Sequence, residues 1–250
     1  MAGSVNPVQT ALITGGSRGI GLAAALGLGS LGYRVILVGQ SEERAQSAAE
    51  ALCQRGIAAF GYGCDVASAH DVAQLNSTLQ ANPETSVIDV LITSAGVMSE
   101  RMAKTLRTRP EEWQRVMGVN LDGVFHCISA FVPGMVERRS GRVITVSACL
   151  GRFTGPGLGG GLAPYRISKT AVNALTRNLA AELQFGKRGV LVDAMCPNHC
   201  RTDMGGPDAP RSAEEGADTI VWLATRAATM PDGEPVPTGL LWEDRAQIPW

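Results

Sequence analysis

Short apolar runs alternate with longer amphipathic stretches along most of the chain. Six runs have the length of β-strands and a seventh is weaker; they span 8–13, 34–38, 58–63, 87–93, 142–147, 190–196 and 239–242. Near-continuous apolar strands separated by segments of helical length are typical of repeated βαβ units, in which helices cover both faces of a parallel sheet. The pattern therefore predicts an α/β fold with a doubly wound parallel sheet of about seven strands.

Neither an internal repeat nor a linker interrupts this pattern, so we expect residues 1–250 to form a single domain. Two of the expected helices, at about 110–138 and 164–185, are longer and more apolar than the others. The second carries a face of small residues that suits close packing of another helix, in the core or at a subunit interface. The glycine-rich segment 151–161 is expected to be a flexible loop that closes over a substrate.

Charge is nearly balanced, with 22 basic and 23 acidic residues and no run of either sign. The chain therefore lacks the basic patch that binds nucleic acid or anionic lipid, and we expect no nucleic-acid and no membrane partner. No segment approaches the roughly 18 apolar residues of a membrane span, and residues 1–7 lack the pattern of a signal peptide. We expect a cytoplasmic protein.

Six cysteines are scattered through apolar segments: Cys53, Cys64, Cys127, Cys149, Cys196 and Cys200. None belongs to a Cys-x-x-Cys pair, and no histidine lies at metal-ligand spacing from one of them. We therefore expect reduced, mostly buried thiols and no metal site.

A glycine-rich turn directly follows the first predicted strand and precedes the helical run 22–31. Its sequence is Thr14-Gly15-Gly16-Ser17-Arg18-Gly19-Ile20-Gly21. Glycines in such a turn let the backbone approach a pyrophosphate closely, and the free amides and dipole of the helix start favour its negative charge. A helix-capping turn is the structural alternative, but the position at the first βα junction favours dinucleotide binding. The predicted cofactor contacts are Gly15, Ser17, Arg18, Gly19, Ile20 and Gly21.

The residues after the second predicted strand indicate which dinucleotide binds. They read Val38-Gly39-Gln40-Ser41, without the carboxylate that usually holds the adenosine ribose hydroxyls. Nothing there repels a 2′-phosphate, and Arg18 is able to pair with one, which favours NADPH over NADH. Gln40 and Ser41 are therefore predicted cofactor contacts. For Arg18, a solvated loop charge is the alternative.

Asp65 and Val66 follow the third predicted strand. Their carboxylate and backbone amide are suitably placed to meet the adenine edge, so both are predicted cofactor contacts. The alternative for Asp65 is a helix N-cap.

Tyr165 and Lys169 lie four residues apart in the predicted helix 164–185, so both side chains project from one face about one turn apart. A nearby ammonium group lowers a tyrosine pKa from about 10 towards neutral pH. Such a tyrosine can give a proton to a carbonyl oxygen while hydride reaches the carbon. The spacing alone is a weak signal, because helical pairs of this kind arise by chance. After a dinucleotide-binding turn it becomes specific.

Together these features resemble the short-chain dehydrogenase/reductase family, from about Val8 to the C-terminus. The matching segments are residues 14–21, Asp65, Ala95-Gly96 after the fourth predicted strand, Asn120 in Val119-Asn120-Leu121, Tyr165-x-x-x-Lys169, and Pro197 with Thr202 after the sixth strand. The resemblance implies a Rossmann-type sheet that binds NADP(H) along the carboxyl ends of its strands. It also implies a homodimer or homotetramer.

The family pattern implies a role for each matching residue. Tyr165 is the acid/base, and Lys169 binds the nicotinamide ribose and tunes Tyr165. Asn120 holds a water of the proton relay, although a satisfied polar group inside a helix is the alternative. Thr202 contacts the nicotinamide carboxamide, and the remaining implied cofactor contacts are Ser94, Ala95, Gly96 and Pro197.

Three substitutions depart from the family on the substrate side of the cofactor. The family's catalytic serine, the second residue of a pair after the fifth strand, falls on Ala148 in Ser147-Ala148. Ser147 points to the opposite face unless a bulge re-aims it. Asn198 replaces the glycine, and Ser94 the asparagine, that the family usually has.

His199 and Cys200 follow these substitutions, where nicotinamide and substrate are expected to meet. His199 can donate a hydrogen bond or a proton near neutral pH. Both residues are candidate substrate contacts, as are Ser147 and Ala148, and a pocket wall without a chemical role is the alternative for His199 and Cys200. We expect the substrate pocket between the ends of strands four to six, the loop 151–161 and the segment 203–212.

The sequence favours an NADPH-dependent oxidoreductase that reduces a small or medium organic carbonyl or imine, with Tyr165 as proton donor. Loss of one oxyanion donor typically slows such a reaction about 10²- to 10³-fold. Substrates that carry their own activation, such as a protonated imine, a quinone or an enone, depend less on the missing hydroxyl. The alternatives are a non-redox isomerase, cyclase or dehydratase with structural NADP, and a cofactor-binding protein without turnover.

Overall fold

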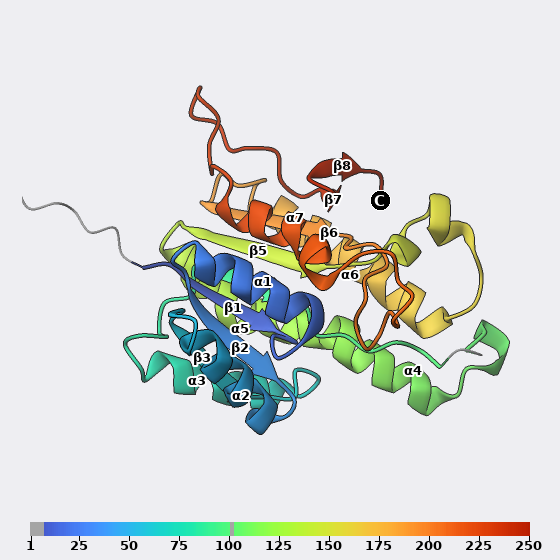
Figure 1. Cartoon of the computed structure of the whole chain (residues 1–250). Coiled ribbons are helices and arrows are strands. Elements are labelled where there is room, and N and C mark those ends of the chain that lie inside the picture. Colours follow the sequence, from blue (N-terminus) through green and yellow to red (C-terminus); the bar gives the residue numbers. More distant parts are fainter. Residues whose placement is uncertain (1–7, 101–102) are drawn as a thin grey trace, which may run out of the picture.

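The computed structural model describes residues 8–100 and 103–250. The signal-peptide prediction concerns residues 1–7, which lie outside the described residues. In the described part, eight strands form one sheet in the order β3-β2-β1-β4-β5-β6-β7-β8 (Figure 1). The strands are β1 (Thr10–Thr14), β2 (Arg34–Gly39), β3 (Ala59–Gly63), β4 (Val90–Thr93), β5 (Gly141–Val146), β6 (Val190–Met195), β7 (Leu241–Glu243) and β8 (Ala246–Ile248).

Neighbouring strands pair in parallel, except that β8 runs antiparallel to β7. The doubly wound parallel sheet is confirmed, and β8 is an addition that the apolar pattern does not predict. The turn between β7 and β8 consists of Asp244 and Arg245, whose φ angles are 51° and 60°. Hairpin turns with two left-handed residues usually carry Asn-Gly or Asp-Gly. The usual hairpin signal is therefore missing from this sequence.

Helices cover both faces of the sheet. They are α1 (Gly19–Ser30), α2 (Glu42–Cys53), α3 (Ala69–Gln80), α4 (Pro110–Met117), α5 (Gly123–Glu137), α6 (Ala163–Glu182) and α7 (Ala213–Thr225). One hydrophobic core joins the sheet to α1, α2 and α7, and a second joins it to α3, α5 and α6. Figure 1 shows α1 and α7 side by side on one face.

The strands are apolar throughout because successive side chains alternate between these two cores. In β1, Leu12 packs into the core with α3, α5 and α6, whereas Ala11 and Ile13 pack into the other. All three side chains are completely buried. Burial on both faces explains why the pattern predicted a helix-covered parallel sheet.

The predicted helix at 110–138 is present, but a π-helical turn interrupts it. This turn, Gly118–Asp122, joins α4 to α5. Such turns are rare and often lie at functional sites. Asn120, a predicted site residue, lies in this turn and is completely buried.

The segment Pro110–Glu137 is also long and apolar enough to cross a membrane, judged by length and composition alone. This corrects the expectation that no segment approaches that length. Its Cys127, Phe131 and Met135 side chains are buried in the core with the sheet. Core helices pass the same test, so the segment is only a weak indication of a membrane span.

A buried ion pair holds the sheet edge beyond β6. Asp193 in β6 bonds the Arg226 guanidinium at 2.7 Å, and it accepts hydrogen bonds from the Trp242 indole at 2.9 Å and the Leu240 amide at 3.2 Å. The Arg226 guanidinium also lies over the rings of Trp222 and Trp242, 5.1 and 4.9 Å from their centroids. The position of β7 beside β6 therefore depends on the Asp193 carboxylate.

Removal of this carboxylate leaves Arg226 buried without its partner. We expect Asp193→Ala to lower the free energy of unfolding by about 3–5 kcal/mol, as is usual when one member of a buried pair is lost. Urea denaturation measures the change. The control is Glu84→Ala, which removes the exposed partner of Arg34 and should cost at most about 1 kcal/mol. Equally small losses in both variants would show that the buried pair does not hold this edge.

Candidate active site

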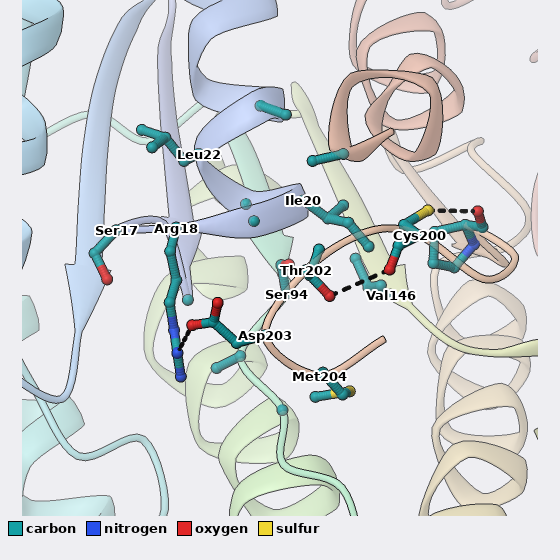
Figure 2. Close-up of a pocket in the computed structure, with 18 of the residues that line it drawn as sticks. Ser17, Arg18, Ile20, Leu22, Ser94, Val146, Cys200, Thr202, Asp203 and Met204 are labelled. Carbon is teal, nitrogen blue, oxygen red and sulfur yellow. Dashed lines mark hydrogen bonds and ion pairs between the residues drawn. The ribbon is translucent and has the colours of Figure 1, made fainter. Parts of the chain in front are cut away.

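A cavity of about 1090 Å³ lies along the carboxyl ends of β1 to β6. Doubly wound sheets hold their ligands where the strand order reverses, here between β1 and β4. Figure 2 shows the loop after β1 and the loop after β6 in this region. All cofactor and substrate contacts predicted from the sequence line the cavity, and of the predicted site residues Asn120 alone lies outside its wall.

The backbone of the glycine turn lies so close to its neighbours that side chains at Gly15 and Gly21 would clash. A Cβ on Gly15, whose φ is 65°, would lie 2.9 Å from the Ala95 Cα, and a Cβ on Gly21 would lie 2.4 Å from the Gly15 oxygen. The helix α1 begins at Gly19, and the Arg18 side chain does not cap it. The first amides of α1 therefore have no side-chain partner. This backbone cradle fits the pyrophosphate of a dinucleotide.

The end of the cavity that was predicted to hold adenine lies after β2 and β3. Ser41 Oγ accepts a hydrogen bond from the Arg44 amide at 3.3 Å and caps α2. Asp65 Oδ1 accepts one from the Ala67 amide at 3.0 Å, but the N-cap of α3 is Ser68. The alternative that Asp65 caps this helix is therefore wrong. Its carboxylate remains in the cavity wall.

Arg18 forms an ion pair with Asp203, which links the loop after β1 to the loop after β6 (Figure 2). Arg18 is therefore not an isolated solvated charge. To bind a phosphate, its guanidinium would have to leave Asp203. Both side chains are mostly exposed, so the pair is worth at most about 1 kcal/mol. Asp203 lies in the segment 203–212 that was expected to bound the pocket, but its pairing with Arg18 was not predicted. The sequence analysis missed Arg44 and Arg55, which add positive charge to the cavity wall.

Tyr165 and Lys169 meet at the first turns of α6. The Lys169 Nζ lies 5.9 Å from the centroid of the Tyr165 ring. It donates a hydrogen bond at 2.7 Å to the carbonyl oxygen of Val146, the last residue of β5. Both side chains are buried. The structure thus brings the predicted pair together and fastens it to the edge of the sheet.

Burial controls the protonation of both groups. It lowers the pKa of Lys169 to about 8, against a smaller opposing effect of Cys196. It also raises the pKa of Tyr165 well above its usual value, with smaller contributions from Cys149 and Cys196. The predicted lowering of the Tyr165 pKa by Lys169 is therefore wrong in direction, because desolvation of the phenol outweighs an ammonium group at this distance. Tyr165 is protonated at neutral pH, as a proton donor must be.

Asn120 joins the segment after β4 to α6. Its Oδ1 accepts a hydrogen bond from the Val97 amide at 2.8 Å. Its Nδ2 donates to the Val97 carbonyl at 3.0 Å and to Ser168 Oγ at 3.1 Å. Both polar ends of the side chain are engaged, which fits the alternative of a satisfied, positioning group. A role of Asn120 in holding a water stays a prediction.

The pair after β5 directs its two side chains differently. The Ser147 amide donates to the Met195 carbonyl at 2.8 Å, which extends the ladder between β5 and β6. Its hydroxyl donates at 3.4 Å to the main-chain oxygen of Lys169. Ala148 is buried in an apolar cluster with Val116 and Tyr165. A methyl group, and not a hydroxyl, therefore packs with Tyr165.

His199 and Cys200 form hydrogen bonds within their own loop. The exposed His199 donates from Nε2 to the Gly205 carbonyl at 2.7 Å. Cys200 is buried, and its Sγ donates to the Pro197 carbonyl at 3.1 Å (Figure 2). The neighbouring Thr202 packs against the glycine turn, since its Cγ2 would lie 3.2 Å from a Cβ on Gly19. The hydrogen bonds of His199 and Cys200 fit the alternative that both residues form the pocket wall.

Apolar side chains form the end of the cavity where a substrate is expected: Val97, Met98, Leu150, Leu162 and Met204, of which Met204 belongs to the predicted pocket segment 203–212. No residue of the loop 151–161, which the structure describes in full, lines the cavity. The prediction that this loop bounds the pocket is therefore wrong. The Arg166 guanidinium donates to the Pro156 carbonyl at 3.1 Å and ties the loop to α6 instead.

Comparison with known proteins agrees with this arrangement. A family model described as short chain dehydrogenase matches residues 9–213. The 3-oxoacyl-[acyl-carrier-protein] reductase of Synechocystis sp. is 37% identical over 197 residues, which cover 78% of this chain and 76% of that protein.

Solved structures show the same fold. The gluconate 5-dehydrogenase of Burkholderia cenocepacia, in complex with NADP and tartrate, gives a TM-score of 0.77 at 28% identity, over 86% of this chain and 87% of that one. A metagenomic short-chain oxidoreductase in complex with NADP gives a TM-score of 0.74 at 29% identity, over 88% and 91%. Because the matched segment contains both the glycine turn and the Tyr165–Lys169 pair, the chain belongs to the short-chain dehydrogenase/reductase family of oxidoreductases.

Proposed function

We propose that the protein is an NADPH-dependent reductase of a small or medium organic carbonyl or imine, with Tyr165 as the proton donor. The observation that carries this proposal is a protonated Tyr165 beside Lys169 at the apolar end of a cavity whose other end is a glycine cradle. A relative that is named as a 3-oxoacyl-[acyl-carrier-protein] reductase and two similar structures that contain NADP support the same class of reaction. The apolar wall suits a substrate built on a carbon chain or ring.

The chain's own residues supply the proton and its environment. When bound, NADPH supplies a hydride to the carbonyl or imine carbon. The Tyr165 hydroxyl gives its proton to the substrate oxygen or nitrogen, so that an alcohol or amine forms. Lys169, held by the Val146 carbonyl, stabilises the phenolate that remains and binds the nicotinamide ribose. The apolar cluster around Ala148 keeps water from the phenol.

We infer that Ala148 occupies the position of the family's catalytic serine. Its methyl offers no hydrogen bond to a substrate oxygen, and the Ser147 hydroxyl is engaged by the Lys169 carbonyl. A missing donor of this kind slows the reaction about 10²- to 10³-fold. Protonated imines, quinones and enones need this donor least, so they are the first substrates to test.

The family resemblance also leads us to propose a single domain that works as a homodimer or homotetramer in the cytoplasm. Phe125 on α5 and Ile167 on α6 expose apolar side chains, with exposed fractions of 53% and 41%. Exposed apolar residues on two helices that cover the same face of the sheet suit contact with a second copy of the chain.

Reduction is tested with the purified protein, NADPH and a panel of ketones, 3-oxoacyl thioesters, quinones, enones and cyclic imines. We expect NADPH consumption with at least one class. Tyr165→Phe should then lower kcat at least about 10²-fold, because the proton donor is lost, with NADPH affinity nearly unchanged. Tyr62→Phe is the matched control, since it removes a phenol hydroxyl in β3 outside the cavity wall and should leave kcat unchanged.

Ala148→Ser complements this test by restoring a hydroxyl. It should raise kcat/KM for an unactivated ketone by about 10²-fold, within the usual worth of one such donor. NADPH binding without turnover of any substrate class, in both the native protein and Ala148→Ser, would contradict the proposal. That result would favour non-redox chemistry or a cofactor-binding protein.

Cofactor choice depends on Arg18 in this proposal. Arg18→Ala should raise the Kd for NADPH about 10- to 100-fold, the worth of a hydrogen bond to a charged group, and should leave the Kd for NADH nearly unchanged. Asp203→Asn frees Arg18 from its ion pair and should tighten NADPH binding by up to about fivefold. Isothermal titration calorimetry measures each Kd. Arg107→Ala, an exposed arginine outside the cavity wall, is the control, and equal losses for both cofactors in Arg18→Ala would contradict the assignment.

The buried charge of Lys169 lowers the free energy of unfolding, because burial lowers the pKa of this lysine from 10.5 to about 8. Below about pH 8 the lysine is charged in both states, and the full cost of burying the charge is present. Between about pH 8 and 10.5 the unfolded chain binds more protons than the folded one, so this cost declines as the pH rises.

Lys169→Met, which removes the charge, should therefore raise the Tm at pH 7 by at least about 2–4 °C, the equivalent of 1 kcal/mol for a chain of this size. The gain over the native protein should shrink between pH 8 and 10.5. Lys187→Met, at an exposed lysine, is the control and should leave the Tm unchanged. A lower Tm for Lys169→Met at pH 7 would show that the hydrogen bond to Val146 outweighs the desolvation cost.

A further inference from the structure

Two cysteines meet where β5 and β6 end. The strands pair in parallel with Val146 opposite Met195, and the Ser147 amide extends this ladder. Cys196 follows β6 directly, and Cys149 begins the 3₁₀ turn Cys149–Gly151 that follows β5. The strand register therefore brings the two residues to the same edge of the sheet, at the substrate end of the cavity.

Each of the two thiols is the largest single influence on the pKa of the other, so they lie close together. Cys149 is partly exposed and lines the cavity, whereas Cys196 is completely buried. Cys196 Sγ also accepts a hydrogen bond from the Asn198 amide at 3.4 Å. Asn198 has a left-handed φ of 61°, which directs its amide back towards the end of β6. One thiol is thus open to small molecules in the cavity, and the strand register places a second, buried thiol at the same edge of the sheet.

Their mutual interaction and their unequal burial make the two thiols chemically different. The interaction with Cys196 lowers the pKa of Cys149 below its usual value, whereas the interaction with Cys149, together with burial, raises the pKa of Cys196. Cys149 therefore ionises to a thiolate more readily than Cys196 does, and it is the thiol that reagents in the cavity reach. A thiolate that is accessible to reagents is the form in which cysteine reacts.

The other cysteines lack this combination. Burial raises the pKa of Cys64 to about 11 and that of Cys127 to about 12. The Cys200 thiol is buried and donates to the Pro197 carbonyl. Cys53 is exposed at the end of α2, outside the cavity wall. Accessibility from the cavity and a thiol partner occur together at Cys149.

We propose that Cys149 is a covalent modification site in the wall of the substrate cavity, and that Cys196 is its resolving thiol when the reagent is a peroxide. The proposal concerns covalent chemistry and stands apart from the proposed reduction, so the failure of one leaves the other intact. Membership of the reductase family does not depend on modification of Cys149.

The reaction with hydrogen peroxide takes two steps. The Cys149 thiolate attacks one peroxide oxygen, so that an S–O bond forms and the O–O bond breaks. The leaving hydroxide takes up a proton and becomes water, and Cys149 becomes a sulfenic acid. The Cys196 sulfur then attacks the Cys149 sulfur, so that an S–S bond forms and the S–O bond breaks.

The proton of Cys196 leaves with the departing oxygen as a second water. The two sulfur atoms together lose two electrons, and one peroxide is reduced to two waters. The disulfide would fasten the 3₁₀ turn after β5 to the end of β6. A thiol reductant reverses it.

The test treats the reduced full-length protein with hydrogen peroxide and maps the products by mass spectrometry. We expect a Cys149–Cys196 disulfide that a thiol reductant removes. Cys196→Ser should stop at the Cys149 sulfenic acid, trapped with dimedone, and Cys149→Ser should give neither product. Cys200→Ser is the matched control and should form the disulfide as the native protein does.

Alkylation provides a second measurement that needs no variant. At pH 7 iodoacetamide should modify Cys149 before Cys53, although Cys53 is the more exposed residue. The Cys149 rate should fall as the pH is lowered and the thiolate is protonated, with a midpoint below that of an ordinary cysteine.

Alkylation of Cys53 with Cys149 left unmodified would overturn the modification site. A Cys149 sulfenic acid that persists in the native protein, with no disulfide, would overturn the resolving role of Cys196.

Discussion

Parallel pairing of β4, β5 and β6 is the constraint on which the active site depends. With Thr93 opposite Thr145 and Val146 opposite Met195, the three strands end at one edge. The Lys169 amino group then bonds the last carbonyl of β5, which fixes α6 to that edge. A one-residue slip of β5 would exchange the directions of Ser147 and Ala148. The methyl group that packs with Tyr165 is thus placed by strand register, and not by a loop.

The parts of the fold that the sequence predicts are those in which one local rule applies. Strands buried on both faces read as apolar runs, and the glycine turn needs glycine because Gly15 approaches Ala95 too closely for a side chain. The turn at Asp244 and Arg245 breaks its local rule, because two non-glycine residues adopt left-handed backbone there. The π turn around Asn120 also cannot be recognised in the sequence, since its residues continue the helical pattern on both sides.

The sequence predicts which residue types form the site better than it predicts their protonation and their partners. The Tyr165–Lys169 spacing predicts a neighbouring pair, yet the pKa of Tyr165 is decided by burial among groups from several strands and helices. Asp203 is separated from Arg18 by 185 residues, so no local pattern connects them. Cys149 directly follows Ala148 and could have been suspected from that position. Its partner, Cys196, directly follows another strand, β6, and is identified only when the strand register is known.

The π turn between α4 and α5 also has a consequence for the phase of the helix. Each residue of an α-helix advances the side-chain direction by about 100°, and a π turn accommodates one residue more than an α-helical turn does. Deletion of a single residue within Gly118–Asp122 would let the segment close into an uninterrupted α-helix. The face of α4 would then rotate by about 100° relative to that of α5. Val116 would leave its contact with Ala148 and Tyr165, although neither of these residues had been changed.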